Sequence, residues 1–444
     1  MLFTFLRIKS KQTCRQDLVN NKLETSYVMK AGILKTIIFL ILYTLSSYRL
    51  YSQANLIYGK QFGTTMEDVS ENAISDDAGN LYIGGYTQGD FTNESFGKTD
   101  GFIAKLDSMG NTVWTKQFGT NEDDKISWIT LDKNGNPLVT GSTKGKLGDE
   151  TYGLEDILVV KFNNQGNIIW QKQFGTSNTE AGNTICTDNE GNIYVAGSTK
   201  GKMGKEIIGE KDCFILKLDK NGNQLFLDQF GSAKDDNCHG ITTDNELNIY
   251  LCGRTSGDLA SENKGMTDAY LIKYNKNGEK VNSIQFGSDL HEMASRIALD
   301  KQNNIYLGCS TSGSIATEQQ GKGDCLLVKI DSNFNIGWSR QWGTINWDGI
   351  NGIDINENAT ENIVISGCQN WPECQSFCRI YSKDGDLIWK GNYIAQGEGG
   401  GSCGKGICLN NKGQIYHVEI TGGNLFNSNQ GKHDIFIIKL ALEK

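Results

Sequence analysis

The cysteines carry the most direct chemistry in this 444-residue chain, and most of them lie in its second half. Cys368, Cys374, Cys378 and Cys403 stand close together in the sequence. In an oxidising compartment neighbouring thiols form disulfides, and we predict one between Cys374 and Cys403. Zinc is the alternative, although Cys-x5-Cys-x3-Cys is not a standard ligand spacing. Six further cysteines fall in strand-like patterns, where a free thiol packs as a small hydrophobic group. These are Cys186, Cys213, Cys252, Cys309, Cys325 and Cys408.

Acidic side chains recur at one position of a long repeat. The clear members are Asp68, Asp124, Glu180, Asp236, Glu292 and Asp348, with Glu398 as the expected seventh. A ring of carboxylates could hold calcium, because hard cations prefer oxygen ligands. A residue that recurs in every unit more often builds the unit. We therefore predict that each acid accepts backbone N–H hydrogen bonds in its own loop, or pairs with a nearby Lys or Asn. No cofactor is expected, and calcium is the alternative.

The elements that position these residues follow from a repeat of 56 residues. Gln-Phe-Gly begins at Gln61 and recurs at that interval through Gln285, and Gln-Trp-Gly follows at Gln341. Each unit holds four short β-rich segments separated by turns rich in Asp, Asn and Gly. The first unit has them at residues 71–76, 81–87, 100–107 and 111–118. One such four-stranded sheet cannot bury both faces, so the units must stack as a ring.

The number of units is seven. An Asp opens the third strand of six units, at Asp100, Asp156, Asp212, Asp268, Asp324 and Asp434, and a degenerate unit surrounds Cys374. The last unit lacks a fourth strand, whereas residues 55–63 (NLIYGKQFG) have a fourth-strand pattern with no unit before them. We predict an all-β, seven-bladed β-propeller over residues 55–444, closed by the N-terminal strand joining the last blade.

The consensus resembles a known family. Asp-x-x-Gly-Asn-[Ile/Leu]-Tyr-x-x-Gly, then Gly-x-x-Asp-x-[Phe/Leu]-x-x-Lys, then Gly-Asn-x-x-Trp-x-[Lys/Arg]-Gln-Phe-Gly is similar to the bacterial beta-propeller repeat called SBBP. The resemblance implies a general extracellular scaffold and names no activity, because a fold does not fix a function.

Blade six breaks the symmetry. Gly367 to Cys374 spans seven positions, where the first blade uses fifteen from Gly85 to Asp100. The shorter loop predicts a notch on the face that carries the acids. We place the binding residues around it, because exposed Trp beside polar groups suits a sugar ring or a partner's side chain. They are Trp347, Asp348, Asn370, Trp371, His291 and Glu292. The alternative is that Trp371 and Pro372 only plug the gap.

Two of the four histidines bear on an enzymatic alternative. His239 and His291 are read as lying in corresponding loops of adjacent blades. With a Tyr they would form the acid/base pair of a polysaccharide lyase, a class that includes seven-bladed propellers. The favoured hypothesis is a non-enzymatic scaffold that binds an extracellular glycan or protein through the notched face.

The charge of the chain bears on its partners, and its N-terminal segment bears on its location. Residues 1–54 carry a balance of +6, which leaves −15 on the remainder of a chain of net charge −9 and argues against a nucleic-acid partner. Residues 29–54 read as a signal peptide, with a nine-residue apolar run from Ile37 to Leu45 that is too short for stable membrane insertion. Residues 1–28 are a long leader or a misassigned start. The predicted location is secreted, periplasmic or cell-surface.

Overall fold

The computed structural model describes residues 54–92, 95–147, 151–356, 361–397 and 401–442. Residues Gln53–Lys444 form one compact unit built from 28 strands in seven four-stranded antiparallel sheets. The predicted leader and all but the last residue of the predicted signal peptide lie outside the described residues. Within the described ranges, no helix is long and apolar enough to cross a bilayer.

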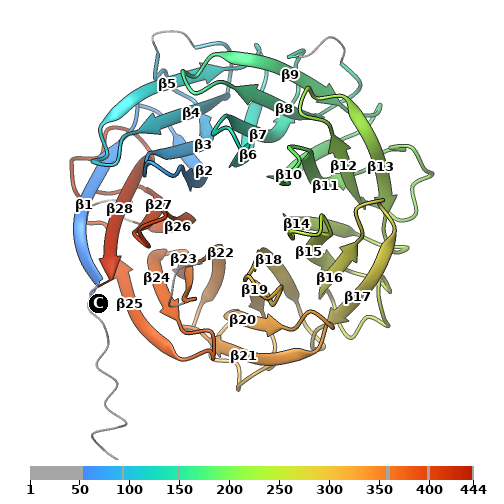
Figure 1. Cartoon of the computed structure of the whole chain (residues 1–444). Coiled ribbons are helices and arrows are strands. Elements are labelled where there is room, and N and C mark those ends of the chain that lie inside the picture. The colour runs from blue at the N-terminus through green and yellow to red at the C-terminus, as the bar shows by residue number, and fades with distance from the viewer. Residues whose placement is uncertain (1–53, 93–94, 148–150, 357–360, 398–400, 443–444) are drawn as a thin grey trace, which may run out of the picture. The chain divides into compact units, whose positions relative to one another are not determined.

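The sheets follow one another around a ring, as Figure 1 shows. Blade one holds β2 (Asp68–Ser75), β3 (Leu81–Thr87), β4 (Asp100–Leu106) and β5 (Thr112–Phe118). Blade two holds β6 (Asp124–Leu131), β7 (Pro137–Thr143), β8 (Asp156–Phe162) and β9 (Ile168–Phe174). Blade three holds β10 (Glu180–Thr187), β11 (Ile193–Thr199), β12 (Asp212–Leu218) and β13 (Gln224–Phe230).

The second half of the ring repeats the pattern. Blade four holds β14 (Asp236–Thr243), β15 (Ile249–Thr255), β16 (Asp268–Tyr274) and β17 (Lys280–Phe286). Blade five holds β18 (Glu292–Leu299), β19 (Ile305–Thr311), β20 (Asp324–Ile330) and β21 (Ile336–Trp342). Blade six holds β22 (Trp347–Ile355), β23 (Ile363–Trp371), β24 (Gln375–Tyr381) and β25 (Leu387–Tyr393).

Blade seven closes the ring with strands from both ends of the described chain. It holds β26 (Ser402–Leu409), β27 (Ile415–Thr421), β28 (Asp434–Leu442) and, as its outer strand, β1 (Ala54–Phe62). The ladder from β1 to β28 runs from Ala54 opposite Leu442 to Phe62 opposite Ile435. The predicted seven-bladed propeller and its closure by the N-terminal strand are therefore confirmed.

Local chemistry explains the turn between the first two strands of a blade. In blade one, Asn80 donates its backbone N–H to Oδ1 of Asp76 at 2.8 Å, and Gly79 adopts a φ of +83°. This backbone conformation is free of steric cost only for glycine, and the Asp side chain holds the turn as an Asx motif. The repeated Asp, Gly and Asn thus build the connection that returns the chain into the sheet.

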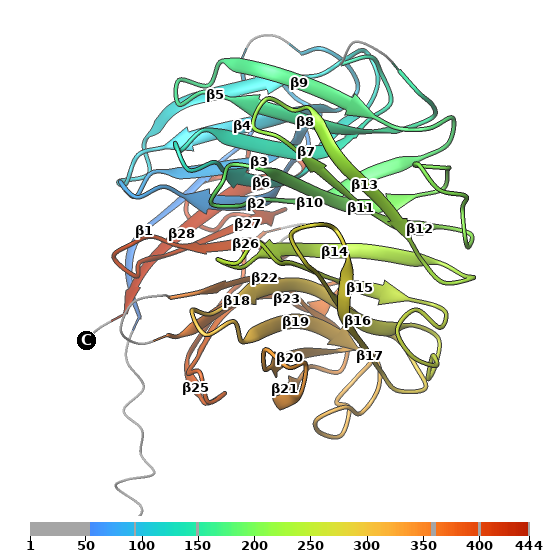
Figure 2. The ribbon, with the colours of Figure 1, turned by 45° about the vertical axis from the view of Figure 1, so that its right-hand side comes forward.

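The core lies between the blades. Seven clusters of buried apolar residues occur in the described chain, and each joins neighbouring sheets. Between blades one and two, Tyr82 and Ile103 pack with Leu158 and Val160. The middle strands are buried on both faces, whereas the outer strand β5 is exposed or half-buried over its first five residues. Figure 2 shows the same ring of blades obliquely, after a turn about the vertical axis.

Candidate functional site

At six of the seven blade boundaries, two buried carboxylates lie together. One opens the third strand of a blade and the other opens the first strand of the next blade. The pairs are Asp434 with Asp68, Asp100 with Asp124, Asp156 with Glu180, Asp212 with Asp236, Asp268 with Glu292, and Asp324 with Asp348. All twelve side chains are buried. We call this arrangement the carboxylate pair.

The repeated Gln-Phe-Gly holds each carboxylate pair in place. Gln117 donates through Nε2 to Oδ2 of Asp100 at 2.8 Å and to the carbonyl of Gly89 at 3.0 Å, and its Oε1 accepts the N–H of Phe91. The Gly packs directly on the acids, since a Cβ at Gly119 would lie 2.5 Å from Oδ1 of Asp100 and 3.0 Å from Oδ2 of Asp124. The tripeptide therefore locks the long loop of a blade to the blade boundary.

The predicted role of the first-strand acids in their own loops is confirmed. The backbone N–H of Thr120 donates to Oδ2 of Asp124 at 2.5 Å, and its hydroxyl donates to the same oxygen. Thr176 bonds Glu180 in the same way. The lysine in the third strand of a blade does not bond these acids. In blade one, the Nζ of Lys105 lies 4.8 Å from the centre of the Tyr82 ring. Burial raises the pKa of Asp124, and the neighbouring Asp100 adds to the shift.

The boundary between blades six and seven has a different construction. Gln375 stands in the place of the third-strand Asp, and Ser402 opens β26 where the other blades have an acid. Ile394 follows β25 where the repeat has its Gly. Ser402 bonds the carbonyl of Tyr393 through its hydroxyl at 2.7 Å, and its N–H bonds the carbonyl of Cys374 at 2.8 Å. The seventh position is therefore Ser402, and Glu398 lies outside the described residues.

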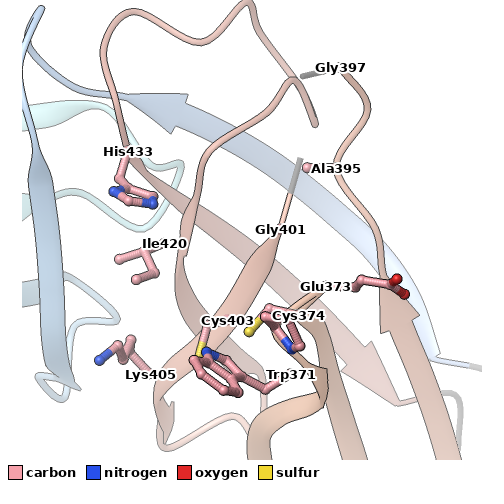
Figure 3. A pocket seen from close by; sticks show the side chains of 11 residues that line it. Trp371, Glu373, Cys374, Ala395, Gly397, Gly401, Cys403, Lys405, Ile420 and His433 are labelled. Atoms are coloured by element: carbon pink, nitrogen blue, oxygen red, sulfur yellow. The ribbon is translucent and has the colours of Figure 1, made fainter. Parts of the chain in front are cut away.

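A pocket of about 750 Å³ opens at this boundary. We call it the notch pocket. Eleven residues line it, and they come from the turn between β23 and β24, from the segment before β26, and from blade seven. They are Trp371, Pro372, Glu373, Cys374, Ala395, Gly397, Gly401, Cys403, Lys405, Ile420 and His433. Figure 3 shows the sulfur atoms of Cys374 and Cys403 near the Trp371 ring. Lys405, Ile420 and His433 lie further along the wall of the pocket.

The cause of the pocket is the short connection in blade six. Only residues 372–374 join β23 to β24, whereas residues 88–99 join β3 to β4. Trp371 continues β23 to its end and is 56% exposed, so it does not fill the space that the missing loop leaves. The predicted shortening thus produces an open pocket at the boundary.

Of the six predicted binding residues, Trp371 alone lines the notch pocket. Trp347 is the ladder partner of Trp371 between β22 and β23, but its ring lies against Gly323 of blade five, where a Cβ would come within 2.5 Å of it. Asn370 donates its N–H to Oδ1 of Asp348 at 2.8 Å and its side-chain amide to Glu373 at 3.0 Å. Asp348 is buried and bonded within its loop, so it orients Asn370 and faces no ligand directly.

The other two predicted binding residues lie at a different boundary. His291 pairs with Thr267, which places it between blades four and five. Glu292 is 1% exposed and bonds Ser288 and Thr311. Neither residue lines the notch pocket. The sequence argument placed them near the notch because it treated consecutive loops as one patch, whereas Glu292 bonds its own blade and, through its N–H, the carbonyl of Thr267 in blade four.

The two histidines of the enzymatic alternative occupy unlike positions. His291 precedes β18 and is exposed, whereas His239 lies three residues inside β14. The register of β14 shifts between Cys238 and Gly240, so His239 is the bulged residue of an innermost strand. Burial, with nearby Arg296, Arg254 and Lys211, lowers the pKa of His239 to about 3. Their interpretation as corresponding loop residues is therefore wrong.

The same bulge recurs in all seven innermost strands. The bulged residues are Glu71, Ser127, Asn183, His239, Ser295, Asn351 and Lys405. Several of them connect blades, as Lys405 does through an ion pair of 3.4 Å with Glu71. Burial opposes the charge of Lys405, but Glu71 and Cys403 outweigh it and raise the pKa of the ammonium. Lys405 therefore brings a positive charge to the wall of the notch pocket.

The cysteines divide into two groups. Cys368, Cys374 and Cys403 interact with one another through their thiols, and Cys374 and Cys403 line the notch pocket. The predicted bond between Cys374 and Cys403 is not formed in this structure, where both are free thiols. Cys378 faces elsewhere, buried in β24. The other cysteines lie in or beside sheet cores, where burial raises the pKa of the thiol, to about 12 for Cys238.

Sequence reasoning missed a buried pair next to the pocket. His417 Nδ1 lies 2.8 Å from Oε1 of Glu419 in β27, and neither side chain is exposed. Burial raises the pKa of Glu419, although His417 opposes the shift. Aligning the repeats would have revealed Glu419, since that register position is Gly in most blades, as at Gly85 and Gly367. Lys405 and His433 carried no comparable signal.

The six acids that were the alternative ligands for calcium do not converge on one point. Each of the six acids bonds its own loop at its own blade boundary. Among the residues that the structure describes, no group of three or more Cys, His, Asp or Glu side chains has a geometry that could hold a metal ion.

Comparison with known families agrees with the repeat. Residues 113–148, 169–202 and 228–260 match the SBBP beta-propeller repeat. The chain therefore contains SBBP beta-propeller repeats, and the resemblance inferred from its consensus is confirmed.

Individual relatives are distant. The chain is 24% identical over 262 residues to a WD repeat-containing protein of Acanthamoeba polyphaga mimivirus. The matched region covers 46% of this chain and 19% of that protein. The chain is 20% identical over 183 residues to the regulatory protein FlaEY of Caulobacter vibrioides, covering 37% and 19%. The matched region spans about a fifth of either relative's length.

Solved structures are similar in fold. An ulvan lyase, a polysaccharide lyase solved with a sugar ligand, matches with a TM-score of 0.48 and 13% identity, covering 86% of this chain and 96% of that one. The WD40 domain of Neurospora crassa Pan2 matches with a TM-score of 0.40 and 10% identity, covering 72% and 90%. At this identity the likeness concerns the fold alone.

Proposed function

We propose that this protein is an extracellular, non-enzymatic propeller scaffold that binds a glycan at the notch pocket. The observation that carries the proposal is the exposed Trp371, which lines an open pocket and has a second exposed tryptophan, Trp347, as its ladder partner. Exposed aromatic rings next to hydrogen-bonding groups are suited to a sugar, whose C–H face stacks while its hydroxyls bond polar side chains.

The surroundings of the rings supply those polar groups. Glu373 and Asn370 bond each other next to Trp371, and Lys405 and His433 line the wall. Large exposed aromatics cost free energy in water, so two exposed tryptophans at paired positions, one of them lining a cavity, favour a binding role over chance exposure. Export, which the basic and apolar segment of residues 29–54 indicates, would bring the pocket to extracellular glycans.

The test is a glycan array with the purified protein, followed by calorimetry on any hit. We expect Trp347→Ala together with Trp371→Ala to weaken binding at least about tenfold, because stacking energy is lost. Tyr152→Ala is the matched control, since Tyr152 has the same 43% exposure as Trp347 but lies in blade two. A hit that the double variant leaves unchanged would move the binding site elsewhere on the propeller.

The remaining outcomes separate the alternatives. Binding to a protein but to no glycan, still lost in the double variant, would make the notch pocket a protein-docking site. Turnover of a polysaccharide by the wild type, lost in His239→Ala or His291→Ala, would instead support a lyase. Absence of any glycan hit contradicts the glycan proposal.

A further inference from the structure

Three thiols from three separate segments meet at the notch pocket. Cys368 belongs to β23, Cys374 to the short turn after it, and Cys403 to β26 of the next blade. Each thiol interacts with the other two. The hydrogen bond from the N–H of Ser402 to the carbonyl of Cys374 fixes the turn against β26. The contact is therefore built by two blades and does not depend on neighbours in sequence.

Access differs within this group, which we call the thiol trio. Cys374 and Cys403 are partly exposed and line the pocket, whereas Cys368 is 8% exposed and does not line it. Among the remaining described cysteines, only Cys186 is not fully buried. A small molecule that enters the notch pocket thus reaches the thiols of Cys374 and Cys403, and the thiol of Cys368 lies next to them.

The electrostatics favour a thiolate at the outermost position. Hydrogen bonds from Cys368 and Cys403 lower the pKa of Cys374, and the positive charge of Lys405 contributes to the same shift. Thiolates, and not thiols, attack disulfides. Burial and apolar packing do the opposite for the thiols of the blade cores, such as Cys252, whose pKa is raised.

We propose that the thiol trio is a thiol–disulfide exchange site for low-molecular-weight disulfides. The Cys374 thiolate attacks one sulfur of the disulfide, the disulfide bond breaks, and half of the molecule leaves as a thiolate. The thiol of Cys403 then loses its proton to solvent and attacks Cys374 Sγ, which releases the second half as a thiolate. Two protein thiols are oxidised to one disulfide while one disulfide is reduced to two thiols.

Cys368 gives the trio a property that a simple pair lacks. After Cys374 and Cys403 have joined, the thiol of Cys368 still lies against the new bond and can attack either sulfur. The disulfide can therefore move among the three positions, and Cys368 can replace Cys403 in the second step. This role is independent of glycan binding, because it uses the sulfurs and not the tryptophans.

The experiment uses dithiobis(nitrobenzoate), an aromatic disulfide, on the reduced and desalted full-length protein without denaturant. We expect a fast phase that releases two nitrothiobenzoate anions per chain, and peptide mapping that finds Cys374 linked to Cys403 or Cys368. Cys374→Ser should abolish the fast phase. Cys186→Ser is the matched control and should leave it unchanged.

The resolving step is tested separately. Cys403→Ser should keep the second release through Cys368, whereas Cys368→Ser combined with Cys403→Ser should release one anion and leave a stable adduct on Cys374, visible by mass spectrometry. A fast phase that survives Cys374→Ser, or a wild-type adduct that never resolves, would overturn the proposal. Circular dichroism of each variant, matching the parent, shows that the serine substitutions report chemistry and not unfolding.

Discussion

The boundary between blades six and seven and the other six boundaries solve the same structural problem in different ways. The six use a buried carboxylate pair, a Gln that binds one acid, and a Gly that leaves room for both. The seventh has Gln375, Ser402 and Ile394 in those places and opens into the notch pocket. All seven keep the hydrogen bond that ties the start of each first strand to the preceding blade, as Asp124 does to Thr99 and Ser402 to Cys374.

The difference shows which features are needed to join two blades. The shared backbone hydrogen bond and the apolar cluster between sheets hold the seventh boundary, where Val364 and Ile380 pack with Ile438. The carboxylate pair and its Gln serve the long loop, because they bond that loop's backbone. Where the loop is short, as in blade six, there is no long loop for the carboxylate pair and its Gln to bond. The residues at these positions can therefore differ and take other roles.

The largest effect should come from the closing blade. Deleting residues 54–62 removes the outer strand of blade seven, its ladder with β28 and the bond from Gln61 to Asp434 at 3.0 Å. Loss of a whole strand should cost more than about 4 kcal/mol and lower the melting temperature by roughly 10 °C or more. Calorimetry on the deletion protein, with the exposed Leu56→Ala as control, measures it. Unchanged melting would mean that closure contributes nothing.

A single methyl group should distinguish the two kinds of boundary. In Gly119→Ala the new Cβ would overlap the buried Asp100 carboxylate, displacing its bonds, and we expect a loss of about 1–3 kcal/mol in urea unfolding. The equivalent residue at the seventh boundary, Ile394, is exposed, so Ile394→Gly should change stability by less than about 1 kcal/mol. Equal effects at both positions would remove the distinction.

Repetition made the fold predictable, including its closure. The interval between Gln-Phe-Gly tripeptides fixes the size of a blade, and the fourth-strand pattern of residues 55–63 has no other partner than the last blade. The short connection in blade six also showed itself as a departure from the repeat. The residues that recur in every blade build the blade. The sequence therefore showed clearly where blade six differs from the others, but it showed less clearly what that difference does.

The contents of the site were less accessible to sequence reasoning. A strict alternation along a strand does not reveal a bulge, so the sequence did not identify Lys405 and His239 as the bulged residues of their strands. The meeting of Cys368 with Cys374 and Cys403 depends on how β23 lies against β26 of another blade, which pairwise spacing does not encode. Glu398 was expected as the seventh acid, whereas the register places Ser402 opposite Thr421, just as Asp124 lies opposite Thr143.

The smallest predicted effect concerns the charge of the carboxylate pair. Burial raises the pKa of Asp68, Asp124, Asp236 and Asp348. A raised pKa means that protonation of these groups stabilises the fold below their ordinary value of 3.8, and that this contribution is lost as the pH rises through the folded pKa. At neutral pH the ionised form of each of these four acids therefore opposes folding.

Substituting one partner with its amide should relieve that opposition. In Asp100→Asn the amide oxygen can keep the bonds to Gln117 and Phe96, while the amide nitrogen takes the place of Oδ1, which has no partner, and faces Asp124. We expect a gain of about 0.5–1 kcal/mol at pH 7 that shrinks toward pH 4, measured by urea unfolding at several pH values. Gln375→Asn, at the boundary without a carboxylate pair, should show no such pH dependence. A gain of equal size at both pH values would mean that packing, and not charge, separates the six boundaries from the seventh.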